Sequence, residues 1–373
     1  MTFPVYAEVE LGAITHNLGQ VQRLVGPGVA VMAVVKANAY GHGLVEVARR
    51  AVTSGATWLG VARVGEGAEI RQAGIDAPVL VLGYTPPERY PEVLAFNLTQ
   101  AVYDLELARA LSEAAQKAQR TVRVHLKIDT GMGRLGFPAD GAGLEAALRA
   151  ASLPRLEVEG IFTHFATADE ADKSYAREQL ERFHTSLDTL RRAGLDAPVI
   201  HAANSAAIID LPESHFNLVR PGIMMYGLYP SDDVQTQRVN LRPAMTLKAR
   251  VAFVKKVPGG FPVSYSCTHV TPRPTILATV PVGYADGYFR VLSNRAEVLI
   301  HGRRCRVVGT VCMDQIVVDA GDTTDVAVGD EVVLFGRQGD ALLPVDEIAA
   351  VAGTINYEIV CAVSARVPRV YLS

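Results

Sequence analysis

Short apolar runs alternate with helical patterns from the start of the chain to Tyr229. The eight runs that predict strands are 30–35, 58–62, 79–82, 100–103, 122–128, 156–162, 199–202 and 217–219. Most of them are continuously apolar, which is typical of strands buried on both faces. The segments between them are rich in Ala, Leu, Glu and Arg, and they predict helices at 44–53, 65–73, 105–118, 141–151 and 171–193. Glycine closes several of these helices, as at Gly55, Gly74 and Gly194.

This alternation predicts an α/β fold, and eight strand–helix units predict a (β/α)8 TIM-type barrel. An open, doubly wound sheet would show the same alternation. The barrel is favoured because no GxGxxG nucleotide-binding fingerprint follows an early strand. We therefore predict an N-terminal barrel over residues 1–230.

The pattern of hydrophobic and polar residues changes after Tyr229. Pro230 to Asp233 read as a linker, and short β-branched or alternating runs follow at 245–254, 275–280, 297–300, 305–311, 316–319 and 331–334. One helix is expected at 344–353. These patterns predict a second, mainly β domain over residues 240–373. The opening is strand-like at 3–9, and residues 1–10 are a candidate to pack with this β domain instead of joining the barrel.

Composition narrows the class of protein. Of the 373 residues, 49% are hydrophobic and 20% are charged, which excludes a disordered chain. The net charge of −3 gives no support to a nucleic-acid or membrane partner. Four cysteines without a CxxC pair indicate reduced thiols, and the opening MTFPVYAEVE has no signal-peptide pattern, so we expect a soluble, cytoplasmic protein. The nine histidines show no HxH or HExxH spacing, so no metal site is expected.

Polar residues and glycines follow the predicted strands, where a barrel builds its active site. The segments are AVVKANAYGHG with Lys36, KIDTGMGRLG with Lys127 and Arg134, FTHFAT with His164, HAANSAA with His201, Asn204 and Ser205, and VRPGIMMYG with Arg220, Gly222 and Ile223. Their position just past the strands predicts one common site at the mouth of the barrel.

Two of these features indicate a cofactor. Lys36 follows an apolar run, and desolvation would lower the pKa of its amine and suit Schiff-base chemistry, although a lone lysine at a strand end more often extends into solvent. The loops after the last two strands offer Ser205 and the backbone of Gly222 and Ile223 to a phosphate, unless Ser205 is an ordinary helix N-cap. A lysine for an aldehyde and a cradle for a phosphate together point to pyridoxal 5′-phosphate (PLP).

The sequence resembles the alanine racemases, PLP enzymes of fold type III, along nearly its whole length. AVVKANAYGHG resembles the PLP-lysine signature of that family. The other matching segments, in family order, are YAEVELGAITHN, DTGMGRLG, THFATADE, RPGIMMYG, PVGYADGY, VCMDQ and INYE. The resemblance implies a cytoplasmic isomerase that interconverts L-alanine and D-alanine and supplies D-alanine for peptidoglycan.

The resemblance also implies a role for each matching residue. Lys36 would carry PLP and act as the base on one face of the substrate, and Tyr265 would be the base on the other face. Because Tyr265 lies in the β domain, the family arrangement would place it in the active site of the partner subunit of a homodimer. PLP would be held by Lys36, Tyr40, His164, Asn204, Ser205, Arg220, Gly222, Ile223 and Tyr357. The substrate would contact Arg134 and the backbone of Met313.

A further set would lie behind the site or at its entrance: Lys127, His201, Asp169, Tyr284, Arg290 and Asp314. Lys127 matches a position that is often carbamylated in the family. Arg220 would contact the pyridine nitrogen, which should then stay unprotonated because a guanidinium cannot accept a proton. Tyr265 would need a neighbouring cation, His164 or an arginine, to favour its phenolate. Thr310 departs from the family, where many members carry an arginine thought to line the entrance. Loss of this arginine should weaken attraction of the substrate carboxylate and so affect substrate affinity, but not the type of reaction.

Three other functions compete with this one. A related PLP-dependent decarboxylase generally carries an acidic residue at the pyridine nitrogen, which Arg220 disfavours. A racemase of broader specificity is less favoured because Met313 and the tyrosines indicate a small pocket. A PLP-binding protein without turnover would resemble the barrel alone, whereas this chain has a complete second domain.

Overall fold

The computed structural model describes residues 3–322 and 325–373. These residues form two compact units. The barrel unit comprises Ala13–Ala39 and Leu44–Arg242, and the β unit comprises residues 3–12, Tyr40–Gly43 and Pro243–Ser373.

Eight parallel strands form the barrel, in the order β10-β2-β3-β4-β5-β6-β8-β9. They are β2 Ala30–Val34, β3 Trp58–Val61, β4 Val79–Val81, β5 Thr99–Val102, β6 Val122–Asp129, β8 Leu156–Phe162, β9 Val199–His201 and β10 Leu218–Val219. The end strands β9 and β10 also contact each other, so the sheet is nearly closed. The short strand β7 (Phe137–Pro138) pairs with the end of β6. The predicted barrel is thus confirmed.

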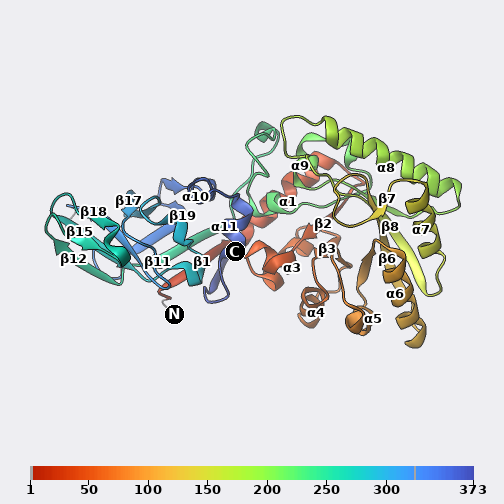
Figure 1. Ribbon diagram of the computed structural model, residues 1–373, viewed down its shortest axis with the longest axis horizontal. Helices are drawn as coiled ribbons and strands as arrows, with labels where there is room; N and C mark the ends of the chain where they lie inside the picture. The colour runs from red at the N-terminus through yellow and green to blue at the C-terminus, as the bar shows by residue number, and fades with distance from the viewer. Residues whose placement is uncertain (1–2, 323–324) are drawn as a thin grey trace. The chain divides into compact units, whose positions relative to one another are not determined.

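Helices cover the outside of these strands (Figure 1). They are α1 Leu11–Val25, α3 Leu44–Thr53, α4 Val64–Gln72, α5 Tyr90–Ala95, α6 Leu105–Lys117, α7 Gly141–Ala151, α8 Ser174–Arg192 and α9 Ser205–Asp210. The barrel interior is filled by Met32, Trp58, Leu80, Ala101, Phe162 and Leu218, which are all buried. Apolar side chains of the strands therefore supply this core.

The β unit is built on one large sheet in the order β12-β15-β18-β17-β16-β19-β11-β1-β21, with β20 paired to β19. Its strands are β1 Val5–Glu10, β11 Met245–Arg250, β12 Phe253–Val257, β15 Thr275–Val280, β16 Glu297–Ile300, β17 Arg303–Val307, β18 Ile316–Gly321, β19 Glu331–Gln338, β20 Ala341–Leu343 and β21 Arg369–Leu372. A small hairpin joins β13 (Pro262–Val263) to β14 (His269–Val270). The helices are α10 Val345–Ala352 and α11 Asn356–Ala362.

The opening strand β1 pairs antiparallel with β11 and parallel with β21, so it belongs to this sheet. The predicted run 245–254 was wrong as a single strand. It forms two strands, β11 and β12, because the backbone changes its pairing partner at residues 251 and 252. The N–H of Val251 bonds to the carbonyl of Asp330, whereas the N–H of Ala252 bonds to the carbonyl of Thr279. The run predicted at 305–311 ends at Val307, since Gly309 turns the chain with a φ of 76°.

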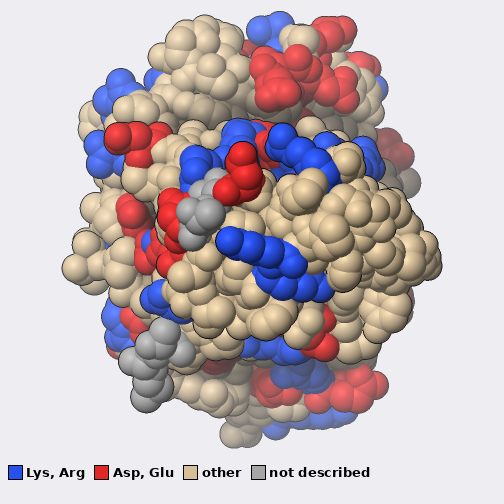
Figure 2. Space-filling model, turned by 90° about the vertical axis from the view of Figure 1, so that its left-hand side faces the viewer, with Lys and Arg blue, Asp and Glu red and all other residues tan. Residues whose placement is uncertain are grey.

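Charged side chains of both signs are mixed on the face drawn in Figure 2. This mixture agrees with the near balance of 36 basic and 39 acidic residues. Within 3–322 and 325–373, no helix combines the length and apolarity needed to cross a membrane.

Candidate active site

The predicted residues of the barrel lie at the carboxyl ends of its strands. Lys36 follows β2, Lys127 lies near the end of β6, His201 ends β9 and Arg220 follows β10. Since all these strands are parallel, their carboxyl ends meet at one edge. The electrostatic effects agree, because the positive charges of Arg220, Arg134, Lys127 and Lys36 all act on the imidazole of His164. The barrel therefore brings five of the predicted residues into one cationic cluster.

Arg220 lies at the centre of this cluster and is only 4% exposed. Its Nη1 is 2.8 Å from Nδ1 of His201. Its Nη2 donates to the carbonyl oxygens of Ala202 (2.8 Å) and Thr163 (2.9 Å), and lies 3.1 Å from Nδ1 of His164. Burial lowers the pKa of Arg220 to about 9, so the guanidinium remains charged at neutral pH. A buried cation held by neutral acceptors is well suited to receive an acceptor atom of a ligand.

Two histidines, His201 and His125, extend the hydrogen-bonded network from Arg220 to Glu159. Nε2 of His201 is 2.8 Å from Nδ1 of His125, and Nε2 of His125 is 3.7 Å from the carboxylate of Glu159. Because a guanidinium can only donate, Nδ1 of His201 must accept and its Nε2 must carry the hydrogen. The same logic places the hydrogen of His125 on Nε2, facing Glu159. Burial lowers the pKa of both histidines, which agrees with two neutral rings.

Lys127 is a second buried cation of the cluster. Burial and the charges of Arg134, Arg220 and Lys36 lower its pKa to about 8, while only Asp129 acts in the opposite direction. About a tenth of the side chain is then the neutral amine at pH 7. Neutral amines are the nucleophilic form, so Lys127 is prepared to react at its nitrogen.

Ser205 connects the loops after β9 and β10. Its Oγ accepts hydrogen bonds from the backbone N–H groups of Gly222 (2.9 Å) and Met224 (3.3 Å). The N-cap of α9 is Asn204, whose Oδ1 accepts from Ala207 at 3.0 Å, so the N-cap interpretation of Ser205 is wrong. Ser205 and Ile223 each begin a short helix, where the first N–H groups lack an intrahelical acceptor. Such groups are suited to an anion.

The turn after Lys36 has an unusual backbone. Ala37, Asn38, Ala39 and Tyr40 all have φ between 51° and 55°, which is the left-handed region. Their segment forms one left-handed turn, α2 (Lys36–Tyr40). Left-handed helix costs about 1–2 kcal/mol per L-residue, so other contacts must hold it.

Glu66 supplies these contacts from the start of α4. Its Oε1 accepts from the N–H of Ala37 (2.7 Å), and its Oε2 accepts from Ala62 (2.8 Å) and Arg63 (3.0 Å). The side chain of Asn38 also accepts from the N–H of Leu44 at 2.9 Å. Sequence reasoning missed Glu66, because its spacing from the helix start resembles an ordinary capping residue.

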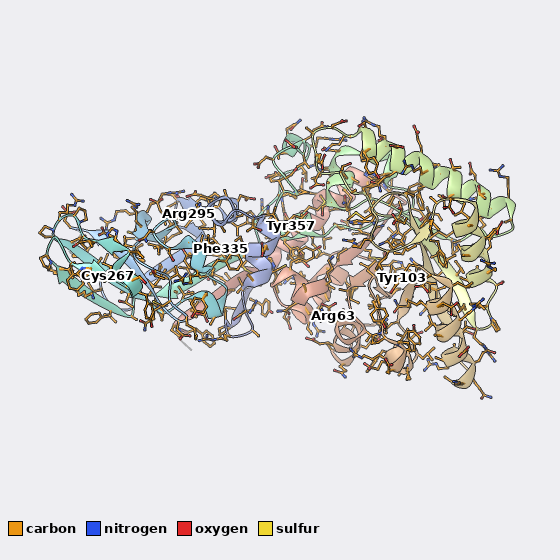
Figure 3. The ribbon with its side chains drawn as sticks, in the orientation of Figure 1. Arg63, Tyr103, Cys267, Arg295, Phe335 and Tyr357 are labelled. Atoms are coloured by element: carbon orange, nitrogen blue, oxygen red, sulfur yellow. The ribbon has the colours of Figure 1, made fainter. Side chains whose placement is uncertain are left out.

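Tyr40 and Tyr357 belong to the β unit and lie near each other there. Their ring centroids are 6.2 Å apart, and Tyr357 is on α11 (Figure 3). Burial strongly raises the pKa of Tyr40, so its phenol stays protonated and can donate. Gly41 follows with a φ of 82°, and a Cβ there would lie 2.1 Å from the carbonyl oxygen of Val360. Glycine is therefore required where this turn meets α11.

Tyr265 lies on the surface of the β unit and is 70% exposed. Its turn, which also contains the labelled Cys267 in Figure 3, has positive φ at Ser264, Ser266 and Cys267. Oγ1 of Thr310 donates to the carbonyl of Tyr265 at 3.0 Å, and Oγ of Ser264 donates to the carbonyl of Thr310 at 2.6 Å. Thr310 is buried, so in this chain it supports the Tyr265 turn.

Tyr284 and Met313 are held side by side in the β unit. The N–H of Tyr284 bonds to the carbonyl of Cys312 at 3.1 Å, and the N–H of Ala285 bonds to the carbonyl of Met313 at 3.0 Å. Arg366 bridges Asp286 (3.5 Å) and Asp314 (2.7 Å) across the two segments. Met313 lies three residues after Thr310 in the sequence, so the segment that holds Tyr284 also carries the hydroxyl that holds the Tyr265 turn.

The two remaining predicted residues are in separate units. Arg290 begins a 3-10 turn of the β unit, Arg290–Leu292, and its side chain is exposed. The carbonyl of Asp169 in the barrel unit accepts a hydrogen bond from Ser231 at 2.5 Å.

One expectation about charge needs correction. Burial and four neighbouring cations lower the pKa of His164 well below its usual value. His164 is therefore neutral at pH 7 and cannot be the cation that would favour a phenolate at Tyr265.

Sequence reasoning also missed His125. The signal was present, because His125 and Lys127 are two positions apart in β6 and so share a strand face. In the described part of the chain, no three His, Cys, Asp or Glu side chains are grouped to hold a metal ion.

Comparison with known proteins gives a consistent result over the whole chain. The family model described as "Alanine racemase, N-terminal domain" matches residues 9–230, and "Alanine racemase, C-terminal domain" matches residues 244–371. The alanine racemase of Desulforamulus reducens is 51% identical over 372 residues, covering 100% of both chains.

Solved structures agree with this match. The alanine racemase of Clostridium difficile 630 has a TM-score of 0.95 and 43% identity, covering 100% of this chain and 96% of that one. The alanine racemase of Bacillus anthracis with bound L-Ala-P has a TM-score of 0.95 and 39% identity, with the same coverage.

Proposed function

This chain belongs to the alanine racemase family and is an isomerase that racemises alanine, and from that premise we propose how it does so. The proposed cofactor is PLP at the mouth of the barrel, and the proposed bases are Lys36 and Tyr265, acting on opposite faces of the α-carbon. Racemisation requires removal of a proton from one face and delivery to the other, so one base per face avoids turning the substrate.

The electrostatics of the barrel mouth fit PLP. The cofactor carries a phosphate dianion. The barrel mouth supplies positive charge from Lys36, Lys127, Arg134 and Arg220, and one carboxylate, that of Asp129, opposes them at Lys127. Ser205 and Ile223 would hold the phosphate through backbone N–H groups, together with Tyr40 and Tyr357. The N–H of Gly222, which donates to Oγ of Ser205, would turn to the phosphate when it binds. Asn204 supports this cradle by capping α9, and His164 would line the cofactor pocket.

Arg220 fits the pyridine nitrogen. Within the described residues, Nη1 of Arg220 has one acceptor, Nδ1 of His201, although it carries two N–H groups. The second N–H can donate to a ring nitrogen that carries no proton. PLP, when bound, withdraws electrons from the α-carbon and so acidifies its proton. An unprotonated ring withdraws electrons less strongly, which would limit side reactions such as transamination.

The two bases are proposed to divide the work by face. Lys36 would hold or release the proton on one face at Nζ, and Tyr265 of a second copy would do so on the other face at its phenolic oxygen. Tyr265, Met313 and Tyr284 expose large side chains on the β unit, at 70%, 52% and 43%. Exposure of three such side chains supports a homodimer in which this surface completes the partner's site. Asp169, Arg290 and Asp314 would lie along the entrance.

Arg134 is proposed to bind the substrate carboxylate, together with the Met313 backbone. Lys127 is proposed to be carbamylated, because its amine is partly neutral and is surrounded by cations. Addition of CO2 to the amine would release one proton and leave a carbamate anion, which would neutralise part of the cluster and orient Arg134. A 13C signal from labelled bicarbonate that is lost in Lys127→Met would support this modification.

We further propose the division into a barrel domain over 1–230 and a β domain over 240–373 that supplies Tyr265. A cytoplasmic enzyme that provides D-alanine for peptidoglycan fits four free cysteines and the absence of a membrane-spanning helix among the described residues.

The observation that carries the proposal is the buried Arg220 with its neutral histidine partners at the carboxyl end of the barrel. The test is to purify the chain with PLP and incubate it with L-alanine in D2O. We expect a yellow protein, exchange of the α-proton and loss of optical rotation. Release of CO2 would indicate a decarboxylase, and a yellow but inert protein would indicate a binding protein; either result would overturn the proposal.

A further inference from the structure

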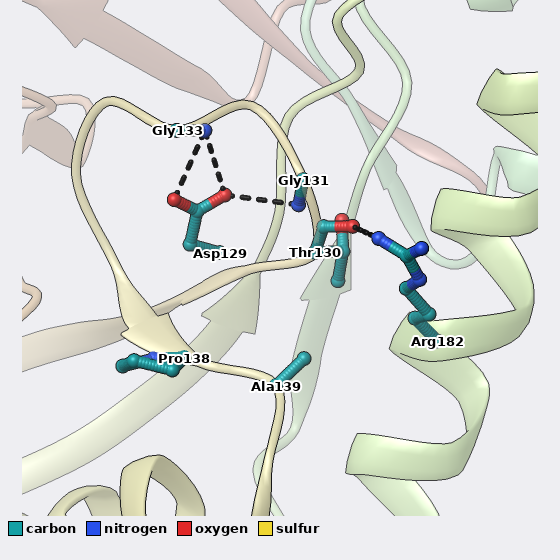
Figure 4. Close-up of a pocket in the computed structure, with 7 residues that line it drawn as sticks. All are labelled: Asp129, Thr130, Gly131, Gly133, Pro138, Ala139 and Arg182. Carbon is teal, nitrogen blue, oxygen red and sulfur yellow. Dashed lines mark hydrogen bonds between the residues drawn. The ribbon is translucent and has the colours of Figure 1, made fainter.

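The loop that carries Arg134 starts where β6 ends, and the carboxylate of Asp129 sets its shape. That carboxylate accepts hydrogen bonds from the backbone N–H groups of residues 131–133, at 2.9 to 3.1 Å. Figure 4 shows those from Gly131 and Gly133. Gly131 and Gly133 have φ of 133° and 69°. A Cβ on Gly131 would lie 2.4 Å from the hydroxyl of Tyr175, so the loop packs directly against α8.

Helix α8 binds the backbone of this loop with two side chains. The hydroxyl of Tyr175 donates to the carbonyl of Gly131 at 2.9 Å, and Nη1 of Arg182 donates to the carbonyl of Thr130 at 3.1 Å. Arg182 also pairs with Glu178 at 2.5 Å. The pattern of Arg and Glu on this helix is typical of a solvent-exposed face. Arg182 nevertheless also binds the backbone of the loop. An open pocket of about 380 Å³ lies between Asp129 and Arg182 (Figure 4).

Gln179 lies between these two side chains and is completely buried. Its Oε1 accepts from the N–H of Ala166 at 2.8 Å. Its Nε2 donates to the carbonyl of His164 at 3.2 Å and to Oγ1 of Thr130 at 3.4 Å. One side chain thus binds the loop that follows β6 and the loop that follows β8.

A glutamine suits this place because it offers donors and an acceptor in one planar group. Buried backbone groups require partners, and the N–H of Ala166 would lose its acceptor without Gln179. A direct hydrogen bond between Oγ1 of Thr130 and Oγ1 of Thr163 (2.8 Å) joins the same two loops, and the three contacts of Gln179 hold them together from the side of α8.

We propose that Gln179 is a positioning residue for the carboxylate-binding site. It fixes the Arg134 loop relative to the loop of His164, so that the guanidinium of Arg134 is held where the substrate carboxylate binds. This inference rests on the proposed function of Arg134. Tyr175 and Arg182 support the same loop from the next turns of α8.

The experiment compares Gln179→Met with wild type in the full chain loaded with PLP. Gln116→Met is the matched control, since Gln116 is exposed on α6. The probe is propionate, a carboxylate of the size of alanine without its amino group. We expect Gln179→Met to raise the Ki of propionate and the KM of alanine about tenfold, with kcat within threefold and an unchanged PLP absorption spectrum. An unchanged Ki for propionate overturns the proposal, as does an equal loss in Gln116→Met.

A double-variant cycle with Arg134→Ala separates this inference from the proposed function. If Gln179 acts through Arg134, Gln179→Met causes no further loss of propionate binding in the Arg134→Ala background. Losses that multiply would show an independent effect and refute the positioning role. If Arg134→Ala alone leaves propionate binding unchanged, the proposed role of Arg134 fails, whatever the result for Gln179.

A second variant keeps the test available if Gln179→Met does not fold. Arg182→Met removes the bond to the Thr130 carbonyl from a half-exposed position. We expect about a threefold rise in the Ki of propionate with kcat preserved, and no change in Ki would count against the proposal.

Discussion

The left-handed turn after Lys36 allows a quantitative test through Glu66. Three residues of the turn that lack a conformational preference for this region, Ala37, Ala39 and Tyr40, together cost roughly 3–6 kcal/mol at about 1–2 kcal/mol each. The carboxylate of Glu66 offsets part of this cost by accepting three backbone hydrogen bonds, one of them from Ala37. The turn is thus a strained segment to whose stability Glu66 contributes, beside the bond from Leu44 to Asn38.

Glu66→Gln removes one of the two acceptor oxygens. The amide oxygen should remain with the two N–H groups of Ala62 and Arg63, which leaves the amide NH2 facing the N–H of Ala37. Ala37 is exposed, so the loss is that of the hydrogen bond itself; a hydrogen bond to a charged acceptor contributes about 1.5–3 kcal/mol, and we expect the turn to lose about 2 kcal/mol. This value corresponds to about a 30-fold shift of the equilibrium toward a relaxed turn.

The assay is reconstitution of the apoprotein with PLP, followed by absorbance. Because only the competent turn presents Lys36 correctly, the apparent Kd should rise by at least threefold and by up to about 30-fold. Glu69→Gln is the matched control, since Glu69 is exposed on the same helix. A Kd for Glu66→Gln within twofold of that for Glu69→Gln would refute the reasoning.

Three other predictions concern the proposed chemistry. Arg220→Glu should leave PLP bound but lower racemisation and raise transamination products, as measured by chromatography; an unchanged product spectrum would contradict the role of Arg220. Tyr265→Phe should slow α-proton exchange from L-alanine more than from D-alanine in D2O, and equal slowing would argue against a face-specific base. In CO2-free buffer, wild type should gain stability relative to Lys127→Met as pH rises from about 8 to about 10, because the folded pKa of Lys127 is lowered to about 8 while the unfolded chain still binds its proton. Parallel denaturation midpoints over this range would rule out the buried cation.

The strand and helix pattern could be predicted closely because it depends on local periodicity. The helices at 44–53 and 141–151 match α3 and α7 at both ends, and the runs 156–162, 275–280 and 297–300 match strands residue for residue. The prediction of 245–254 as one strand was wrong because the run contains no Gly or Pro to mark a break, and only the pairing partners of Val251 and Ala252 divide it.

The site was predicted in part for the same reason. A barrel places the ends of its strands together, so Lys36, His164, His201 and Arg220 could be grouped from their positions alone. Glu66, His125 and Gln179 could not be grouped, since their partners lie far away in sequence. Gln179 is an ordinary polar residue of an amphipathic helix until the fold places Thr130 and His164 beside it.

The order of residues by itself determined the barrel, the β domain and the edge at which the reactive side chains meet, because hydrophobic burial with a period of two or 3.6 residues is a local property. Only the tertiary structure decided the charge states and orientations. The neutral ring of His164, the lowered pKa of Lys127 and the hydrogen positions along Arg220, His201 and His125 arise from burial and from charges brought close by folding. Electrostatic energies depend on distances through space and on exclusion of water, and neither quantity can be derived from the spacing of residues along the chain.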